Sequence, residues 1–326
     1  CVEAFVCDVH RISAVFAAKV EVACYHPLDG YRRADGGWQT GRAGSIGLRM
    51  TVPCGRCIGC RLERSRQWAV RCMHEAQMHP DSCFVTLTYS DENVPETGSL
   101  DRAAFQRFMK RLRRKLEPVS LRYFHCGEYG DQFGRPHYHA CIFGTGFPDR
   151  TRWTVRGGNE VWRSEILEEA WPLGHSEIGS LTFESAAYAA RYATKKLAAD
   201  ASMDEETYRR WKERYERVNP LTGEVVELEP EYATMSNRPG IGRKWIEKYL
   251  YDVYPHDHVI SRGFPAKPPR YYDQVLEELD PAMAEEVYAR RVAERDRENQ
   301  TPERLQVREV CTKKRLNLYS NREVAL

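Results

Sequence analysis

The sequence lacks several features that would place it in a functional class at once. No run of 18 apolar residues occurs among its 326 residues, which argues against a helix that spans a membrane. Charged residues interrupt the apolar stretch near the start, so no secretory signal forms. Neither charge sign dominates, because the formal net charge is only +2, and the average therefore says nothing about an acidic or basic partner. Without an export signal we expect the reducing environment of a cytoplasm.

The chain also lacks internal repeats and an initiating methionine, and we expect the natural protein to begin near Ala23. Three regions differ in composition. Residues 1–50 are glycine-rich late on and predict an irregular N-terminal segment. Residues 51–200 contain a cysteine-rich knuckle, basic helices and the motifs that could carry chemistry. Residues 201–326 are charged and interrupted by prolines, which predicts a partly disordered C-terminal region.

Hydrophobic periodicity predicts an α+β fold. Apolar residues at helical spacing indicate helices over 61–79, 99–116 and 182–199. The β-branched and aromatic segment 82–90 indicates a buried strand, and residues 121–144 indicate two further strands joined as a hairpin. Because the strands adjoin in sequence, we expect an antiparallel sheet with helices packed on one face.

Two histidines lie one residue apart in the second hairpin strand. Residues two apart in a strand point to the same face, so His137 and His139 project side by side. They either bind one metal ion or are two polar residues of a strand. Glu128 lies nine residues upstream, where the hairpin returns it beside them; alone it would be an exposed hairpin residue. Two imidazoles and a carboxylate suit Mg²⁺ or Mn²⁺ engaged in phosphoryl chemistry.

The helix over 182–199 carries a pair of tyrosines. Tyr188 and Tyr192 are four residues apart and share one face, and Lys195 and Lys196 continue it. Such pairs are usually core residues, but alanines surround these two and leave room for a large substrate. A nearby ammonium group can stabilise a phenolate or a phosphate, and an ordinary tyrosine, with a pKa of about 10, needs that help to act as a nucleophile.

Four of the eleven cysteines lie within residues 54–72. Cys54, Cys57 and Cys60 offer three thiolates at the spacing of a zinc knuckle. Cys24, His26 or Cys72 could complete a structural Zn²⁺ site, and Cys24 is the preferred fourth ligand. An iron–sulfur cluster uses similar spacing, but the fourth Cys followed by Pro is absent. Unpaired thiols are the remaining alternative.

Two basic stretches could contact nucleic acid. A charged helix face is usually only solvated, but beside a nuclease-like constellation the two stretches together predict contacts to phosphates. The predicted DNA-binding residues are Arg61, Arg64, Arg66, Arg107, Lys110, Arg111, Arg113 and Arg114.

The strand "FVTLTY" (84–89), the hairpin "PHYH" and the helix segment "YAARYATKK" occur in the order of the three motifs of HUH endonucleases, which initiate rolling-circle replication. The blocks "CYHPLDGYR", "PCGRCIGCRLERSRQWAVRC", "CGEYG", "SNRPGIGRKW" and "PPRYYD" resemble the replication initiators of gokushovirus-type microviruses and related prophages. The resemblance covers roughly residues 23–273. Residues 1–22 match nothing recognised.

The resemblance implies an RRM-like or ferredoxin-like HUH core. It implies that His137 and His139 are metal ligands with Glu128 as the third, and that Tyr188 and Tyr192 are nucleophiles followed by the family's lysines, Lys195 and Lys196. The implied activity is nicking of single-stranded origin DNA, through a 5′-phosphotyrosine, and rejoining of the strand. The implied partners are the origin DNA and a host helicase and DNA polymerase, in the cytoplasm of a host bacterium.

Two alternatives stay open at this point. A transposase or relaxase relative would use the same chemistry on another substrate. A zinc-bearing nucleic-acid-binding protein without catalysis would belong to a different class, although the joint presence of Glu128, both histidines and both tyrosines argues against it.

Overall fold

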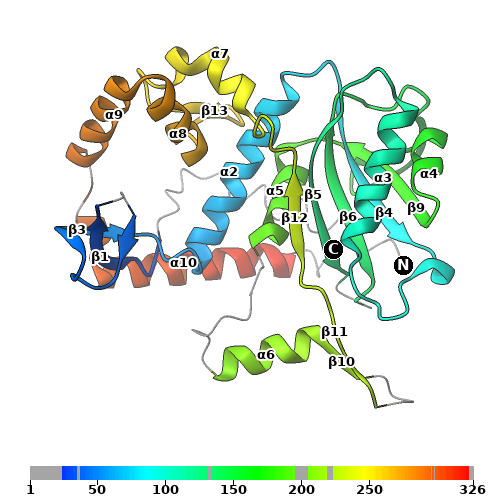
Figure 1. Ribbon diagram of the computed structural model, residues 1–326, viewed down its shortest axis with the longest axis horizontal. Coiled ribbons are helices and arrows are strands. Elements are labelled where there is room, and N and C mark those ends of the chain that lie inside the picture. Colours follow the sequence, from blue (N-terminus) through cyan, green and yellow to red (C-terminus); the bar gives the residue numbers. More distant parts are fainter. Residues whose placement is uncertain are drawn as a thin grey trace.

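A computed structural model describes residues 24–34, 37–130, 134–194, 205–218, 223–294, 296 and 298–322. The central element is a seven-stranded sheet in the order β12-β5-β6-β4-β9-β8-β7 (Figure 1). Every printed pairing in this sheet is antiparallel, so the predicted α+β class with an antiparallel sheet is confirmed. Its strands are β4 (Ser82–Tyr89), β5 (Arg122–Tyr129), β6 (Pro136–Phe143), β7 (Thr151–Arg156), β8 (Asn159–Arg163), β9 (Gly174–Ser180) and β12 (Tyr232–Met235).

Helices cover both faces of this sheet, which extends the expected arrangement. One face packs against α2 (Ile58–Ala76) and α5 (Phe183–Thr194), through residues such as Phe124 and Cys141. The other face packs against α3 (Arg102–Lys115) and α4 (Glu165–Ala170), through residues such as Val85 and Ile142. Because side chains alternate along a strand, neighbouring residues of β4, β5 and β6 enter two separate cores. We call these faces the α2/α5 face and the α3/α4 face.

Local capping explains where the two longest sheet-covering helices begin. The thiol of Cys57 accepts a hydrogen bond from the backbone N–H of Cys60 at the start of α2. The carboxylate of Asp101 accepts from the N–H of Ala103 at the start of α3, as the predicted Ser or Asp cap required. Each cap satisfies one of the N–H groups that a helix leaves without a partner in its first turn.

The N-terminal segment is more regular than its composition suggests. Strands β1 (Leu28–Arg33), β2 (Trp38–Gln39) and β3 (Ser45–Val52) form a three-stranded antiparallel sheet, where an irregular segment was expected. Tight turns with glycine at positive φ, such as Gly44 and Gly47, supply the chain reversals, so the glycines that suggested irregularity belong to a small sheet.

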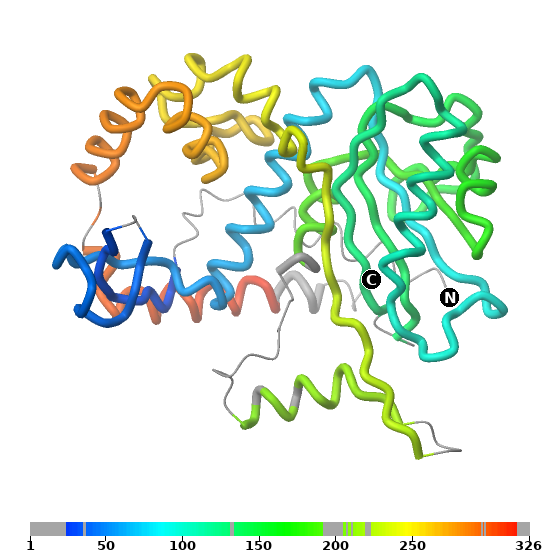
Figure 2. The backbone as a smooth tube through the Cα atoms, viewed as in Figure 1, coloured from blue at the N-terminus to red at the C-terminus, as the bar shows by residue number. Residues whose placement is uncertain are grey.

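The C-terminal region forms a layer of helices on α2, visible at the upper left of Figures 1 and 2. Its elements are α7 (Arg243–Val253), β13 (Val259–Ser261), β14 (Phe264–Ala266), α8 (Arg270–Leu279), α9 (Pro281–Ala293) and α10 (Pro302–Arg322). This order differs from the expected partial disorder. A few large residues such as Trp245, Tyr254 and Tyr272 are buried and anchor the layer, although the average composition is charged.

A further arm consists of α6 (Glu205–Tyr215), β10 (Glu216–Val218) and β11 (Val225–Glu227), and it projects from the sheet beside β12 (Figure 1). Within the described parts of the chain, no helix combines the length and apolar character needed to cross a bilayer. The division into units 1–50, 51–200 and 201–326 stays a prediction.

Candidate metal and nucleophile site

The hairpin of β5 and β6 brings a carboxylate between two histidines. Glu128 and His137 are direct partners across the two strands, and Cys126 is the partner of His139. All three site residues therefore point to the α2/α5 face. The Oε1 atom of Glu128 lies 2.8 Å from Nε2 of His137 and 3.0 Å from Nε2 of His139. The three side chains are buried, and their ligand atoms all lie within 4.8 Å of one another.

Each histidine is oriented by a second hydrogen bond on its other ring nitrogen. Nδ1 of His137 lies 3.0 Å from the carbonyl oxygen of Arg135, and Nδ1 of His139 lies 3.1 Å from Oγ1 of Thr86. A carbonyl can only accept, so Nδ1 of His137 carries the proton and Nε2 of a neutral ring carries a lone pair. That lone pair faces the Glu128 carboxylate, and two acceptors in contact require either an imidazolium proton or a cation.

The electrostatics of the site favour bound cations. Burial by itself opposes ionisation of Glu128, but the charge and hydrogen bonds of His139 and His137 hold the pKa of its carboxyl well below the usual range. Burial lowers the pKa of His139, which favours the neutral ring that a metal requires. The second carboxylate oxygen of Glu128, Oε2, is buried and has no hydrogen-bond partner among the described residues. A donor set of two nitrogens and one carboxylate with an unsatisfied oxygen fits a divalent metal ion.

The α5 helix adds a phenol to this group. The hydroxyl of Tyr188 donates to Oε1 of Glu128 at 2.7 Å, and its ring meets the ring of His139 edge-on at a centroid distance of 5.2 Å. Buried alanines at 186, 187, 189 and 190 let α5 approach α2 and the sheet closely. Tyr192 lies on the same helix but its side chain is outside the described residues, as are Lys195 and Lys196 altogether.

Four cysteines form a second cluster at the start of α2. The thiols of Cys24, Cys54, Cys57 and Cys60 all lie within 4.8 Å of one another. The Cys54 and Cys60 sulfurs are 4.0 Å apart, as are those of Cys57 and Cys24. His26, one of the alternative fourth ligands, instead lies 2.8 Å from Glu309 of α10.

Backbone N–H groups point at these sulfurs. Cys54 donates its N–H to the Cys24 sulfur at 3.1 Å, and Cys60 and Tyr25 donate theirs to the Cys57 sulfur at 3.4 Å each. Burial opposes thiolate formation at Cys57, but the hydrogen bonds from these N–H groups lower its pKa to about 7. Four half-buried thiols that include one easily ionised member fit a tetrahedral zinc site.

The predicted DNA-binding residues divide between the two faces of the sheet. Helix α2 carries Arg61, Arg64 and Arg66 and lies on the face of the candidate site. Helix α3 carries the other five and lies on the opposite face, so the structure does not bring the two sets together. Several of them also have local partners: Arg66 pairs with Glu63, and Arg107 pairs with Asp101.

Two contributors to the site were not singled out from the sequence. Thr86 and the carbonyl of Arg135 orient the histidines, although neither is a ligand type that draws notice in a sequence. The signal was available for Thr86, because it lies two residues from Phe84 and Thr88 in β4, on the strand face that meets His139 and His137.

The comparisons with known proteins agree with these features. The family model of the replication-associated protein ORF2 matches residues 82–197, a range that includes β4, the β5–β6 hairpin and α5. No solved structure matches the chain.

Three viral proteins are similar over about two thirds of the chain. Replication-associated protein VP4 of Bdellovibrio phage phiMH2K is 37% identical over 235 residues, which cover 68% of this chain and 65% of that protein. Replication-associated protein ORF2 of Spiroplasma virus 4 is 34% identical over 70% of this chain and 68% of its own length. Replication-associated protein ORF4 of Chlamydia phage 1 is 26% identical over 70% of this chain and 54% of its own length.

The chain thus spans slightly less than two thirds of the first of these relatives and slightly more than two thirds of the second. The resemblance to phage replication initiators inferred from the sequence is confirmed at the level of the family. This chain belongs to the family of phage replication-associated proteins that includes ORF2 of Spiroplasma virus 4.

Proposed function

We propose that this protein starts rolling-circle replication of a small single-stranded DNA phage by nicking and rejoining one strand at the origin. The observation that carries the proposal is the hydrogen bond from the Tyr188 hydroxyl to Glu128, at a carboxylate that also faces two histidines. A nucleophile, a proton acceptor and a metal-ligand set then occupy one buried corner of the α2/α5 face.

In the proposed reaction the phenol oxygen of Tyr188 attacks the scissile phosphorus. A new bond forms between this oxygen and phosphorus, and the bond from phosphorus to the 3′ oxygen breaks. The phenol proton passes to the carboxylate side of the Tyr188–Glu128 hydrogen bond, and the departing 3′ oxygen takes a proton from solvent. The products are a 5′-phosphotyrosine and a free 3′-OH that a host polymerase can extend.

Glu128, His137 and His139 would hold Mg²⁺ or Mn²⁺. When bound, the ion supplies charge stabilisation to the phosphate oxygens. The chain itself contributes orientation, since Thr86 and the Arg135 carbonyl fix the two rings and α5 fixes the phenol. The phosphotyrosine retains the free energy of the phosphodiester, so strand closure by the 3′-OH needs no ATP.

Tyr192 is proposed as the second nucleophile, which cuts the regenerated origin after one round, with Lys195 and Lys196 beside the phosphate. The origin strand, a host helicase and a host DNA polymerase are the proposed partners, in the host cytoplasm. We further propose that Cys24, Cys54, Cys57 and Cys60 hold a structural Zn²⁺, because their thiols already converge.

The test is incubation of the protein with the single-stranded genome and Mn²⁺, followed by peptide mapping of any covalent adduct. Either single change, Tyr188→Phe or Tyr192→Phe, should still allow some cleavage and adduct, while impairing closure. The double change should abolish the adduct. An adduct on any other residue, or full nicking by the double variant, would overturn the mechanism.

A further inference from the structure

A cavity of about 220 Å³ between α2 and the first turn of α8 is unusually rich in guanidinium groups. Its lining residues are Arg64, Gln67, Trp68, Arg71, Arg270, Tyr271 and Gln274. Three of the seven are arginines, two are amides, two are aromatic, and none is a carboxylate. It lies on the α2/α5 side of the sheet, where the Trp68 ring contacts Phe124 of β5 at 4.8 Å.

Arg71 forms the floor of this cavity and is held rigidly. Its guanidinium lies 4.0 Å from the centre of the Trp68 ring and 3.9 Å from that of Tyr271, so two aromatic rings sandwich it. Nε donates to the carbonyl of Ile241 at 3.0 Å, and the two terminal nitrogens have no hydrogen-bond partner among the described residues. A planar guanidinium fixed in this way presents its fork to the cavity.

The carboxylates nearest this cavity are already engaged. Burial lowers the pKa of Arg71, and the charge of Glu75 only partly opposes this effect. Glu75 accepts hydrogen bonds from Arg122 and from the backbone N–H of Gly242. Glu63 of α2 accepts two from Arg66. The positive charge of the cavity is therefore not neutralised by the chain.

The rim carries two further arginines. Neither Arg64 nor Arg270 forms an ion pair within the parts of the chain that the structure describes. Arg270 is the first residue of α8, a ten-residue helix whose positive dipole end faces the cavity. Its backbone N–H donates to Oε1 of Gln67, which ties the helix end to α2.

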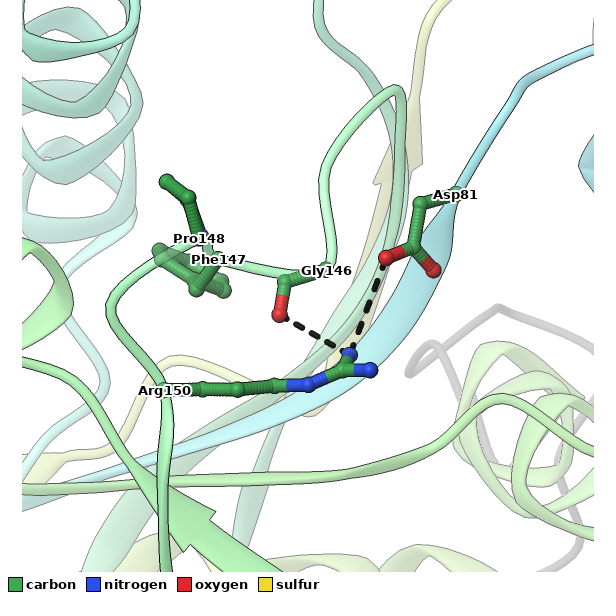
Figure 3. A pocket seen from close by; sticks show the side chains of 5 residues that line it. All are labelled: Asp81, Gly146, Phe147, Pro148 and Arg150. Carbon is green, nitrogen blue, oxygen red and sulfur yellow. Dashed lines mark hydrogen bonds and ion pairs between the residues drawn. The ribbon is translucent and has the colours of Figure 1, made fainter.

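A second cavity, of about 420 Å³, provides the contrast (Figure 3). It also contains an arginine, but Arg150 donates to the carbonyl of Gly146 at 3.0 Å and lies 3.7 Å from the carboxylate of Asp81. Its one guanidinium is thus paired within the chain. The cavity between α2 and α8 has three guanidinium groups and no such partner among the described residues, which is the arrangement that an anion requires.

We propose that the cavity between α2 and α8 binds a backbone phosphate of single-stranded DNA, with Arg71 at its floor and Arg64 and Arg270 contacting the adjoining phosphates. This inference rests on the proposed function, which supplies the strand. A strand-binding groove combines basic groups that follow the backbone with aromatic and amide groups, and these are the groups that line the cavity.

The test compares two double variants that each remove two positive charges. Arg64→Gln/Arg270→Gln changes the rim, and Lys110→Gln/Arg114→Gln changes exposed residues of α3 on the opposite face. Binding of a fluorescent oligothymidylate is measured by anisotropy in EDTA over a series of NaCl concentrations. The rim variant should lower the slope of log affinity against log salt by about 1.4, because each single-strand phosphate contact contributes about 0.7.

The affinity ratio between the unaltered protein and the rim variant should then widen about sevenfold from roughly 200 mM to roughly 50 mM salt. The α3 variant should keep the slope of the unaltered protein. An unchanged slope in the rim variant, or an equal loss in the α3 variant, would overturn the proposal.

Inorganic phosphate, compared with NaCl at equal ionic strength, separates the two sources of a phosphate group. Phosphate that displaces the oligonucleotide from the unaltered protein more than NaCl does, but not from the rim variant, supports the strand site. Calorimetric binding of phosphate to the cavity without displacement of the oligonucleotide would assign the site to the free ion and overturn the proposal. Loss of nicking with this binding pattern intact would remove the proposed function and leave the strand site.

Discussion

His125 and His139 are buried histidines on neighbouring strands of one sheet, yet they occupy different chemical environments. His139 points to the α2/α5 face, where Glu128 and Tyr188 are its neighbours. His125 points to the α3/α4 face, where its ring stacks on Phe105 at 3.5 Å and Nδ1 lies 2.7 Å from the Thr234 hydroxyl. Burial lowers the pKa of both. The pair teaches that burial and residue type do not identify a ligand, whereas the face does.

The largest expected effect breaks the α2/α5 face directly. His137→Ala and His139→Ala should each abolish nicking of single-stranded DNA, because either change removes a proposed metal ligand. Binding of the strand in EDTA should change little, since basic residues position the strand. His125→Ala is the matched control and should lower stability while nicking by the folded protein persists. Unchanged cleavage in the His137/His139 double variant would remove the metal site.

The next largest effect concerns the knuckle that begins α2 and so supports the cover of the α2/α5 face. Cys54→Ser should destabilise the protein by about 4 kcal/mol or more, because a structural metal contributes folding free energy directly. Denaturant unfolding with metal analysis of the purified protein checks it. The exposed Cys311→Ser serves as control and should have little effect. Purified protein that contains neither zinc nor iron would contradict the zinc assignment.

A substitution on the α3/α4 face should affect stability alone. Ile142 is fully buried in the core opposite the candidate site. Ile142→Ala should cost about 3 kcal/mol of the free energy of unfolding through lost packing and a residual cavity. Nicking per folded molecule should stay unchanged, because the neighbouring Cys141 and Phe143 keep the α2/α5 face intact. A selective loss of nicking would show that the two faces are coupled.

The smallest effect is a pH dependence in the layer over α2. His74 stacks on Trp245 at 3.6 Å and lies 2.9 Å from the Tyr272 hydroxyl, and burial lowers its pKa to about 3. The unfolded chain therefore binds a proton near pH 6.5 that the folded chain refuses until about pH 3. The stability that depends on neutral His74 is complete above about pH 6.5 and is lost as the pH falls toward about 3.

His74→Phe should flatten the fall in unfolding free energy over this range, although it lowers stability at about pH 7 by leaving Tyr272 without its partner. Urea unfolding at several pH values measures the slope. The same substitution at the exposed His256 should leave the slope unaltered. An unchanged slope in His74→Phe would show that other groups carry the acid sensitivity.

Period-two alternation and capping accounted for most of the central fold. The strand over 82–90 and the helix over 99–116 were placed within a few residues, because their apolar residues recur at strand and helix spacing. The terminal regions were harder to predict. The sheet of β1 to β3 and the helices α7 to α9 depend on turns and on a few large aromatic anchors, which an average over charged residues conceals.

The sequence by itself determined which side chains could act together along one strand or one helix: His137 with His139, and Cys54 with Cys57 and Cys60. Only the tertiary structure decided which distant groups join them. Cys24 closes the thiol cluster, Tyr188 reaches Glu128 across 60 positions, and Arg71 reaches the Ile241 carbonyl across 170. Local spacing follows from backbone geometry, whereas these contacts follow from how the helices pack on the sheet, which no local pattern encodes.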